Sequence, residues 1–79
     1  MAPTLFRKHG FRFFFYSREE TRMHAHVSHA EGEAKFWLNP QVQLASSHGL
    51  SARQIKQVRL LVEQHRLEII HEWRTYFAA

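Results

Sequence analysis

His24 and His26, which are separated by one residue, are the side chains best suited to chemistry in this sequence. An imidazole changes its charge near neutral pH, so it can accept or donate a proton, and in its neutral form it binds metal ions. On a β-strand, side chains two positions apart share a face and lie about 7 Å from each other. If this segment is a strand, the pair could transfer protons or coordinate a metal.

The alternation of polar and apolar residues predicts which groups join these histidines. Strands are expected over residues 24–28 and 33–38, around a turn at residues 29–32. The apolar residues of both strands share one face only if the turn holds an even number of residues, because a slip of one residue reverses the faces. The predicted core-facing residues are Ala25, Val27, Ala34, Phe36 and Leu38. The predicted pairs on the other face are Ser28–Glu33, His26–Lys35 and His24–Trp37.

The polar groups of that face suit cleavage of RNA without a metal. The reaction needs a base for the 2′-hydroxyl, an acid for the leaving oxygen, and a cation for the phosphorane, and histidine can fill either proton-transfer role. His26 beside Lys35, with His24 two residues away, would supply these groups, so we predict His24, His26 and Lys35 as catalytic residues. The alternative is a solvated face without turnover.

Aromatic and basic residues near this face suit a nucleic acid. Trp37 and Tyr16 could stack on unpaired bases, and arginine guanidinium groups suit phosphate. We therefore predict a nucleic-acid-binding set of Arg12, Tyr16, Trp37, Arg18 and Arg22. The alternative is that such aromatic residues belong to the core, as expected for Phe11, Phe13 and Phe15.

A zinc or nickel site at His24 and His26, with Glu33 as an oxygen ligand, is a further alternative. Only two of these positions are linked by strand geometry. We therefore assign no metal ligands and expect no cofactor.

The remaining elements follow from turn and helix signals. A first hairpin is expected over residues 4–8 and 11–17 around His9-Gly10, and Asn39-Pro40 should end the fourth strand. A short helix is expected over residues 42–48, followed by a long helix from the capping box at residues 51–54 to about residue 77. The predicted fold is α+β: a four-stranded antiparallel sheet of two hairpins, followed by a short and a long C-terminal helix packed on one face.

The long helix carries a wide apolar surface. One stripe contains Ile55, Val58, Val62, Ile69, Trp73 and Tyr76, and flanking positions add Leu60, Leu61, Leu67, Ile70 and Phe77. This apolar surface is wider than packing against one sheet requires. It indicates a second contact, made either with another copy of the chain in a homodimer or with a protein partner.

Composition sets the class of protein. A chain of 79 residues is expected to be a single domain over residues 1–79, and the absence of cysteine excludes disulfides and thiolate metal sites. No apolar run is long enough to cross a bilayer, and the N-terminus lacks the apolar segment of a signal peptide, so we expect a soluble cytoplasmic protein with no membrane partner. Eleven Lys and Arg against seven Asp and Glu give a net charge of +4, which suits RNA or an acidic protein.

Several motifs together resemble the small bacterial family catalogued as domain of unknown function 4160. They are Thr4–Arg7, Gly10–Ser17, His24–Val27, Gly32–Leu38 and Gly49–Ser51. Where Arg22-Met23 stands here, family members usually have one or two prolines. The resemblance implies a bacterial cytosolic protein, often encoded like one half of a toxin–antitoxin pair, with a small protein partner. It supplies no catalytic residues.

These observations lead to one function and two alternatives. The first is a toxin-type component of a toxin–antitoxin pair that acts on RNA through the His/Lys/Trp sheet face, as a metal-independent ribonuclease. The second is a non-enzymatic interaction module, an antitoxin or regulatory partner, that uses the long helix. The third is a metal-binding protein centred on His24 and His26.

Overall fold

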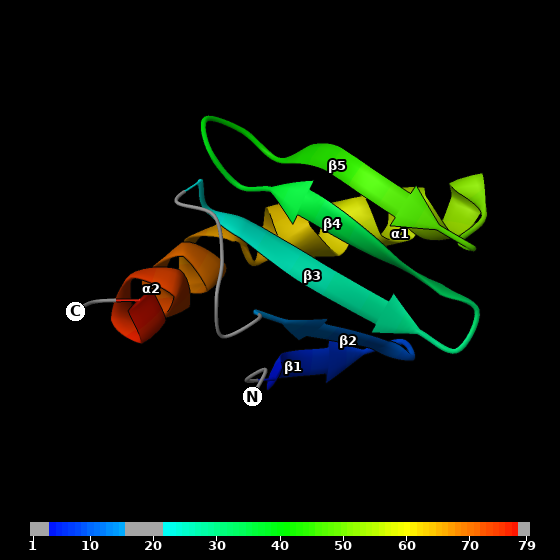
Figure 1. Cartoon of the computed structure of the whole chain (residues 1–79), viewed down its shortest axis with the longest axis horizontal. Helices are drawn as coiled ribbons and strands as arrows, with labels where there is room; N and C mark the ends of the chain where they lie inside the picture. The colour runs from blue at the N-terminus through cyan, green and yellow to red at the C-terminus, as the bar shows by residue number, and fades with distance from the viewer. Residues whose placement is uncertain (1–3, 16–21, 78–79) are drawn as a thin grey trace.

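Figure 1 shows the computed structural model of the chain, which describes residues 4–15 and 22–77. Within these residues, five strands form one antiparallel sheet in the order β1-β2-β3-β4-β5, so each strand lies beside its neighbours in sequence. The strands are β1 (Thr4–Lys8), β2 (Phe11–Phe14), β3 (His24–His29), β4 (Gly32–Trp37) and β5 (Gln43–His48). Two helices follow, α1 (Ala52–Gln64) and α2 (Arg66–Phe77). Neither helix is long and apolar enough to cross a membrane.

The first hairpin turns at His9-Gly10, as predicted. Both residues have a positive φ, of 53° and 83°. A two-residue hairpin turn whose twist matches that of the two strands requires a positive φ at both positions. Leu5 and Phe6 of β1 are half-buried, and β2 carries Phe11, Phe13 and Phe14 as buried residues. The predicted extension of the second strand through residue 17 lies outside the described residues.

The second hairpin has the predicted register. His24 pairs with Trp37, His26 with Lys35, and Ser28 with Glu33. The strands extend one residue further toward the turn than expected, since His29 also pairs with Gly32 and only Ala30 and Glu31 connect them. The turn still contains an even number of residues, and the apolar residues of both strands therefore lie on the core face.

The prediction of a short helix over residues 42–48 is wrong. This segment forms β5, which pairs with β4 from Glu33–His48 to Trp37–Gln43. Gly49 has a φ of +81°, but it ends a strand instead of a helix. A Cβ on Gly32 would lie 2.1 Å from the carbonyl oxygen of His48, so the two backbones touch here and hold the end of β5 beside the β3–β4 turn. The sheet consequently has five strands instead of four.

The prediction of one long C-terminal helix is also wrong. The capping box of Ser51 and Gln54 is present, but α1 ends at Gln64, with His65 as its C-cap, and α2 begins at Arg66. A straight helix over this segment would be about 40 Å long, whereas the longest dimension of the molecule is 36 Å. At the start of α2, Arg66 Nε donates to the carbonyl of Leu38 at 2.8 Å and ties this end of the helix to the end of β4. The helices are therefore similar in length, with 13 and 12 residues.

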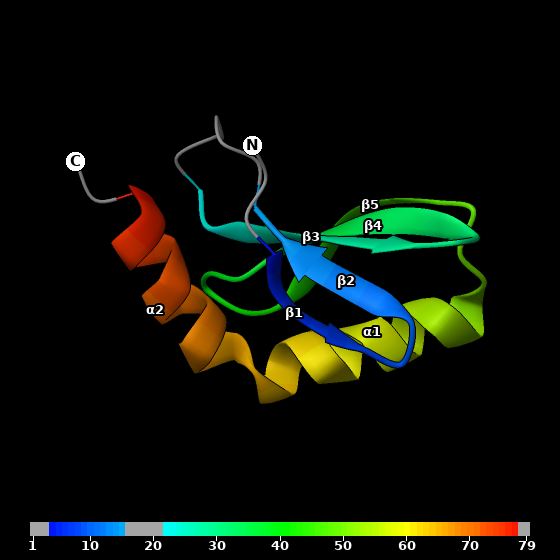
Figure 2. The same cartoon turned by 90° about the horizontal axis from the view of Figure 1, so that it is seen from below.

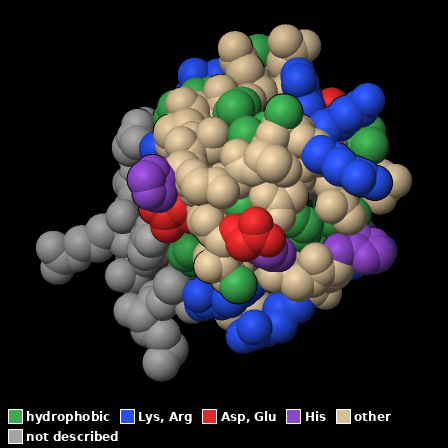
Figure 3. Space-filling view, turned by 90° about the vertical axis from the view of Figure 1, so that its right-hand side faces the viewer, with side chains coloured by type: hydrophobic (Ala, Val, Ile, Leu, Met, Phe, Trp, Pro, Cys, Tyr) green, Lys and Arg blue, Asp and Glu red, His purple; other side chains and the backbone are tan. Residues whose placement is uncertain are grey.

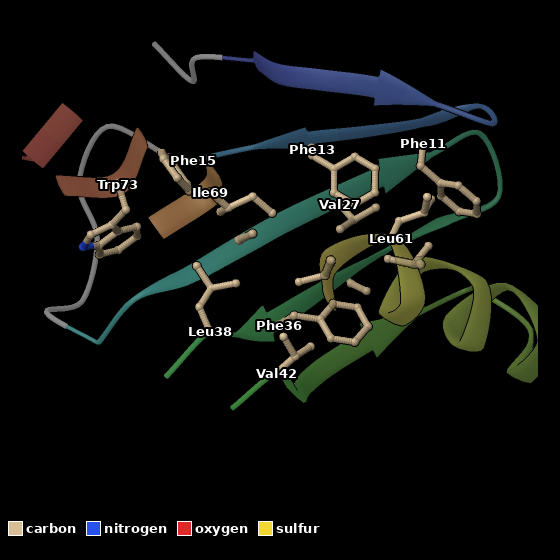
Figure 4. Close-up of a cluster of buried hydrophobic side chains, with 14 of the residues drawn as sticks. Phe11, Phe13, Phe15, Val27, Phe36, Leu38, Val42, Leu61, Ile69 and Trp73 are labelled. Atoms are coloured by element: carbon tan, nitrogen blue, oxygen red, sulfur yellow. The ribbon is translucent and has the colours of Figure 1, made fainter. Parts of the chain in front are cut away.

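The core lies between the sheet and the two helices. Figure 2 shows α1 running beneath the sheet while α2 turns past its end. Figure 4 shows the labelled side chains of both layers pointing toward one another. The residues without exposed surface include Phe13, Phe15, Val27, Phe36, Leu38, Val58 and Val62. The predicted core residues of strands two, three and four are all buried.

Candidate nucleic-acid interface

The register places polar and aromatic side chains in three rows across the face of the sheet opposite the core. Residues paired directly across antiparallel strands present their side chains on the same face. The first row is Arg12, Ser28, Glu33 and His48. The second row is Phe14, His26, Lys35 and Ser46. The third row is His24, Trp37 and Gln43. We refer to these eleven residues as the polar face.

Phe14 links a cation to an imidazole at one side of the polar face. Its ring stacks on that of His26 with a centroid distance of 5.5 Å, and the Arg12 guanidinium carbon lies 4.5 Å from the Phe14 centroid. Arg12 Nε also donates to the Thr4 hydroxyl at 2.8 Å. Aromatic contact and hydrogen bond together restrict the guanidinium, so that its charge stays over the ring.

Trp37 is the other aromatic residue of the polar face that lies beneath cationic side chains. The side chains of Arg22 and Lys35 both lie over its ring, at 4.4 and 4.6 Å from the centroid. Arg22 is further fixed by a hydrogen bond from Nε to the carbonyl of Asn39 at 3.3 Å. The half-buried indole therefore gathers two positive charges that are distant in sequence.

A hollow of about 280 Å³ opens beside Phe14 and is lined by residues of β2, β3, β4 and β5. Its polar lining combines two imidazoles, an ammonium, a carboxylate and two hydroxyls. The lining residues are Phe14, His26, Glu33, Ala34, Lys35, Ser46, Ser47 and His48. Figure 3 views the end of the molecule at which the β1–β2 and β3–β4 turns lie, where basic, acidic and histidine side chains are all exposed. The hollow can bind an anion and offers groups for proton transfer.

His24 differs from the other residues of the polar face because its side chain has no exposed surface. Its ring lies 5.0 Å from that of Trp73 in α2, 5.5 Å from Trp37, and 5.1 Å from His26. Its Nδ1 lies 2.7 Å from the carbonyl oxygen of Arg22. A carbonyl only accepts hydrogen bonds, so Nδ1 is assigned as the protonated nitrogen. His24 therefore packs in the interior, where its Nδ1–H donates to the backbone of Arg22 and its ring lies edge-on to that of His26.

The predicted site residues are brought together in part. His26, Lys35, Trp37 and Arg12 share the polar face, and Arg22 joins it through the Trp37 ring. Tyr16 and Arg18 lie outside the described residues. Within residues 4–15 and 22–77, no group of three or more His, Asp or Glu side chains is placed to hold a metal ion. A third ligand for His24 and His26 is thus absent from this part of the chain.

Sequence reasoning missed Ser46 and His48, because both fall in the segment predicted as a helix. Pairing of β5 with β4 brings His48 opposite Glu33 and Ser46 opposite Lys35. One local signal opposed the helix: the two consecutive serines, Ser46 and Ser47, compete for backbone hydrogen bonds and disfavour a helix interior.

Comparison with known proteins gives one match. The family described as "Domain of unknown function (DUF4160)" matches residues 10–74, which include β2 to β5, α1 and most of α2. Neither a curated protein nor a solved structure matches the chain. The matched range covers well over half of the 79 residues, and the chain therefore belongs to the DUF4160 family.

Proposed function

We propose that this protein binds single-stranded RNA on the polar face and cleaves it without a metal ion. The observation that carries the proposal is the second row of the face, in which His26 and Lys35 lie directly opposite each other between Phe14 and Ser46. Such a row offers an aromatic ring, a proton-transfer group and a cation within a few strand spacings, at the rim of a hollow.

The half-buried Trp37 ring supports binding of an unpaired strand, whereas Phe14 is buried and supports Arg12 and His26. A base gains about 1–3 kcal/mol from stacking on an aromatic ring, and this contact does not depend on sequence. Arg12 over the Phe14 ring, and Arg22 over the Trp37 ring, bring guanidinium groups to this face, where they can contact phosphates of the bound strand. The net charge of +4 favours the same partner.

The hollow supports cleavage by attack of the 2′-hydroxyl. In the proposed step, His26 acts through Nδ1, because its Nε2 is buried, and removes the proton of the 2′-hydroxyl, whose oxygen forms a bond to phosphorus. The bond from phosphorus to the 5′-oxygen breaks, and protonated His48 supplies the proton of the leaving group. Lys35, which lines the hollow with both histidines, stabilises the charge on the phosphorane oxygens. The products are a 2′,3′-cyclic phosphate and a 5′-hydroxyl.

His24 has a positioning role in this proposal. Because it is buried, it does not touch the substrate, but its ring packs edge-on against His26. Cleavage of cellular RNA would make the protein the toxin half of a toxin–antitoxin pair; the family resemblance led us to expect one half of such a pair.

The proposal is tested by incubating the full chain with single-stranded RNA of about ten nucleotides, a length within the range bound by one small domain. Product ends are identified by mass spectrometry, and binding is measured separately by fluorescence anisotropy at two salt concentrations. We expect His26→Ala to slow cleavage about 10²- to 10⁴-fold while RNA binding changes little. Lys35→Ala should weaken both.

Matched controls come from the helices. His71 and Lys56 are exposed residues of α2 and α1, so His71→Ala and Lys56→Ala should leave cleavage unchanged. If His26→Ala cleaves as fast as the natural chain, the assignment of this histidine is wrong. If RNA binds and stays intact, the face is a binding surface only. If no RNA binds at low salt, the proposal fails as a whole.

A further inference from the structure

The hollow beside Phe14 contains a carboxylate that the proposed cleavage does not use. Glu33 lines this hollow together with His26, His48 and Lys35. The two histidines transfer protons in the proposed step, and Lys35 stabilises the phosphorane. A phosphate carries negative charge, so a carboxylate close to it opposes binding. Glu33 must therefore contact a part of the substrate other than the phosphate.

The Glu33 carboxylate is not neutralised by the chain itself. Its side chain is exposed, and within residues 4–15 and 22–77 it takes part in no hydrogen bond or ion pair. Two cations of the polar face are held at aromatic rings instead. Arg12, in the same row as Glu33, lies over the Phe14 ring, and the Lys35 ammonium lies over the Trp37 ring. Both oxygens of the carboxylate can therefore accept hydrogen bonds from a ligand.

The position of Glu33 suits the base of the nucleotide that is cleaved. Glu33 and Lys35 are two residues apart in β4, so their side chains leave the same face about 7 Å from each other. The ribose separates the base of a nucleotide from its phosphate, so one nucleotide can place its phosphate at Lys35 and its base at Glu33. The volume of about 280 Å³ is just below the range of about 300–1,000 Å³ for drug-sized ligands, and it therefore suits a single nucleotide.

The hydrogen-bonding groups of the four bases differ in their fit to a carboxylate, whose two oxygens only accept. Unpaired bases are recognised by proteins on their Watson–Crick edges. Guanine presents two adjacent donors on this edge, N1–H and the 2-amino group, which match the two oxygens. Adenine and cytosine each place one amino group beside a ring nitrogen that only accepts, and uracil places one N–H between two carbonyls. In these three bases an acceptor would face a carboxylate oxygen, so guanine fits best.

We propose that Glu33 makes the hollow specific for guanine, by accepting hydrogen bonds from N1–H and the 2-amino group of the base. The bound guanosine is the nucleotide whose 2′-hydroxyl attacks, so its product ends in guanosine 2′,3′-cyclic phosphate. This inference rests on the proposed function, because it names the base that is bound at the same site.

The first test measures cleavage by the full chain at a single position. Four strands of about ten nucleotides are made of DNA except for one central ribonucleotide, so that each contains one attacking 2′-hydroxyl. The strands differ only in the base of that ribonucleotide. We expect the guanosine strand to be cleaved about 5- to 150-fold faster than the other three, which is the discrimination of one bidentate contact to a base. Equal rates, or a preference for another base, would overturn the proposal.

The second test measures binding without cleavage. The 3′-monophosphates of guanosine, adenosine, cytidine and uridine are titrated separately into the ¹⁵N-labelled full chain. We expect guanosine 3′-monophosphate to bind most tightly and to shift the amide signals of Glu33 and His48. If it does so and no strand is cleaved, the proposed cleavage fails and the guanine site stands. If cleavage occurs but the four monophosphates bind equally, the guanine site fails and the cleavage stands.

Two glutamates of the same hairpin provide a matched pair of variants. Glu33→Gln keeps the size of the side chain but replaces one acceptor oxygen by an amide donor, which opposes guanine and matches the donor and acceptor of adenine or cytosine. We expect cleavage at guanosine to slow at least about fivefold, and cleavage at adenosine and cytidine not to slow. Glu31→Gln is the control, because Glu31 is exposed, does not line the hollow, and would keep an oxygen for the Gln54 amide. It should leave the preference unchanged.

A different result from Glu33→Gln would assign another role to this residue. His48 lies opposite Glu33 in β5, so a carboxylate at this position could orient the imidazole. In that case Glu33→Gln would slow cleavage of all four strands equally and would leave the order of monophosphate binding unchanged. This outcome would overturn the assignment of Glu33 to the base.

Discussion

Phe36 and Trp37 are neighbours in β4, yet they lie in different environments. Phe36 faces the helices and has no exposed surface, whereas Trp37 faces the other side of the sheet and is half-buried beneath Arg22 and Lys35. On the core face, aromatic rings pack against aliphatic side chains and other rings. On the polar face, aromatic rings lie beneath cations or beside imidazoles.

This difference shows how a short chain can keep aromatic residues on a face that it does not fill with core packing. A ring covered by long cationic side chains loses part of its contact with water, while the charged groups of these side chains remain hydrated. The polar face therefore combines apolar platforms with positive charge. The proposed binding of RNA rests on this combination, which the core face lacks.

The largest predicted contrast is between Phe36→Ala and Trp37→Ala. Removing the buried ring should lower the free energy of unfolding by about 3–5 kcal/mol, whereas removing the indole should lower it by about 1–2 kcal/mol, the loss of two exposed cation–π contacts. Urea unfolding followed by circular dichroism measures both. If Phe36→Ala does not fold, Phe36→Leu should still lower stability by about 1–2 kcal/mol. Equal losses at the two positions would contradict the contrast.

His24 allows a sharper test, because it belongs to the polar face by register and to the interior by burial. His24→Ala should lower the free energy of unfolding by about 2–3 kcal/mol, since it leaves a cavity beside Trp73 and removes the hydrogen bond to the Arg22 carbonyl. The melting temperature should fall by about 10 °C or more. His26→Ala, at a half-buried position, should change it by less than about half as much. The reverse order would place His26 inside and His24 on the surface.

The smallest predicted effect concerns the cation over Phe14. A double-mutant cycle with Arg12→Met and Phe14→Leu should give a coupling energy of about 0.5–1 kcal/mol. Arg59 provides the control, since it is exposed on α1 and its contact is with Glu63 at 3.7 Å. Arg59→Met should cost less than about 0.5 kcal/mol, and its effect should vanish in high salt. A coupling energy of zero would show that the Arg12 cation and the Phe14 ring do not stabilise each other.

The hairpins were predictable because local signals specify them. His9-Gly10 favours a tight turn, and the alternation of Ala25, Val27 and Phe36 with polar residues fixes both the register and the core face. Any other register would expose these apolar residues to water. The pairs His26–Lys35 and His24–Trp37 could therefore be derived from sequence, and with them the centre of the polar face.

Residues 42–48 could not be assigned in this way, because no strong period is present and the strand depends on pairing with β4. The contact between Gly32 and the carbonyl of His48 holds it in place, and this contact joins segments that no local pattern connects. The break at His65 is a similar case. Apolar positions on both sides of it keep a helical period, and at the break Arg66 bonds to the Leu38 carbonyl, a contact 28 residues away in sequence.

The sequence by itself determined the antiparallel hairpins, the core residues of the central strands, and the row in which His26 faces Lys35, because alternation and turn chemistry act over a few residues. Tertiary structure decided that His24 is buried, since Trp73 reaches it from α2, and that His48 joins the site, since β5 pairs with β4. These features depend on contacts between residues far apart in the chain, and only packing of the whole molecule specifies them.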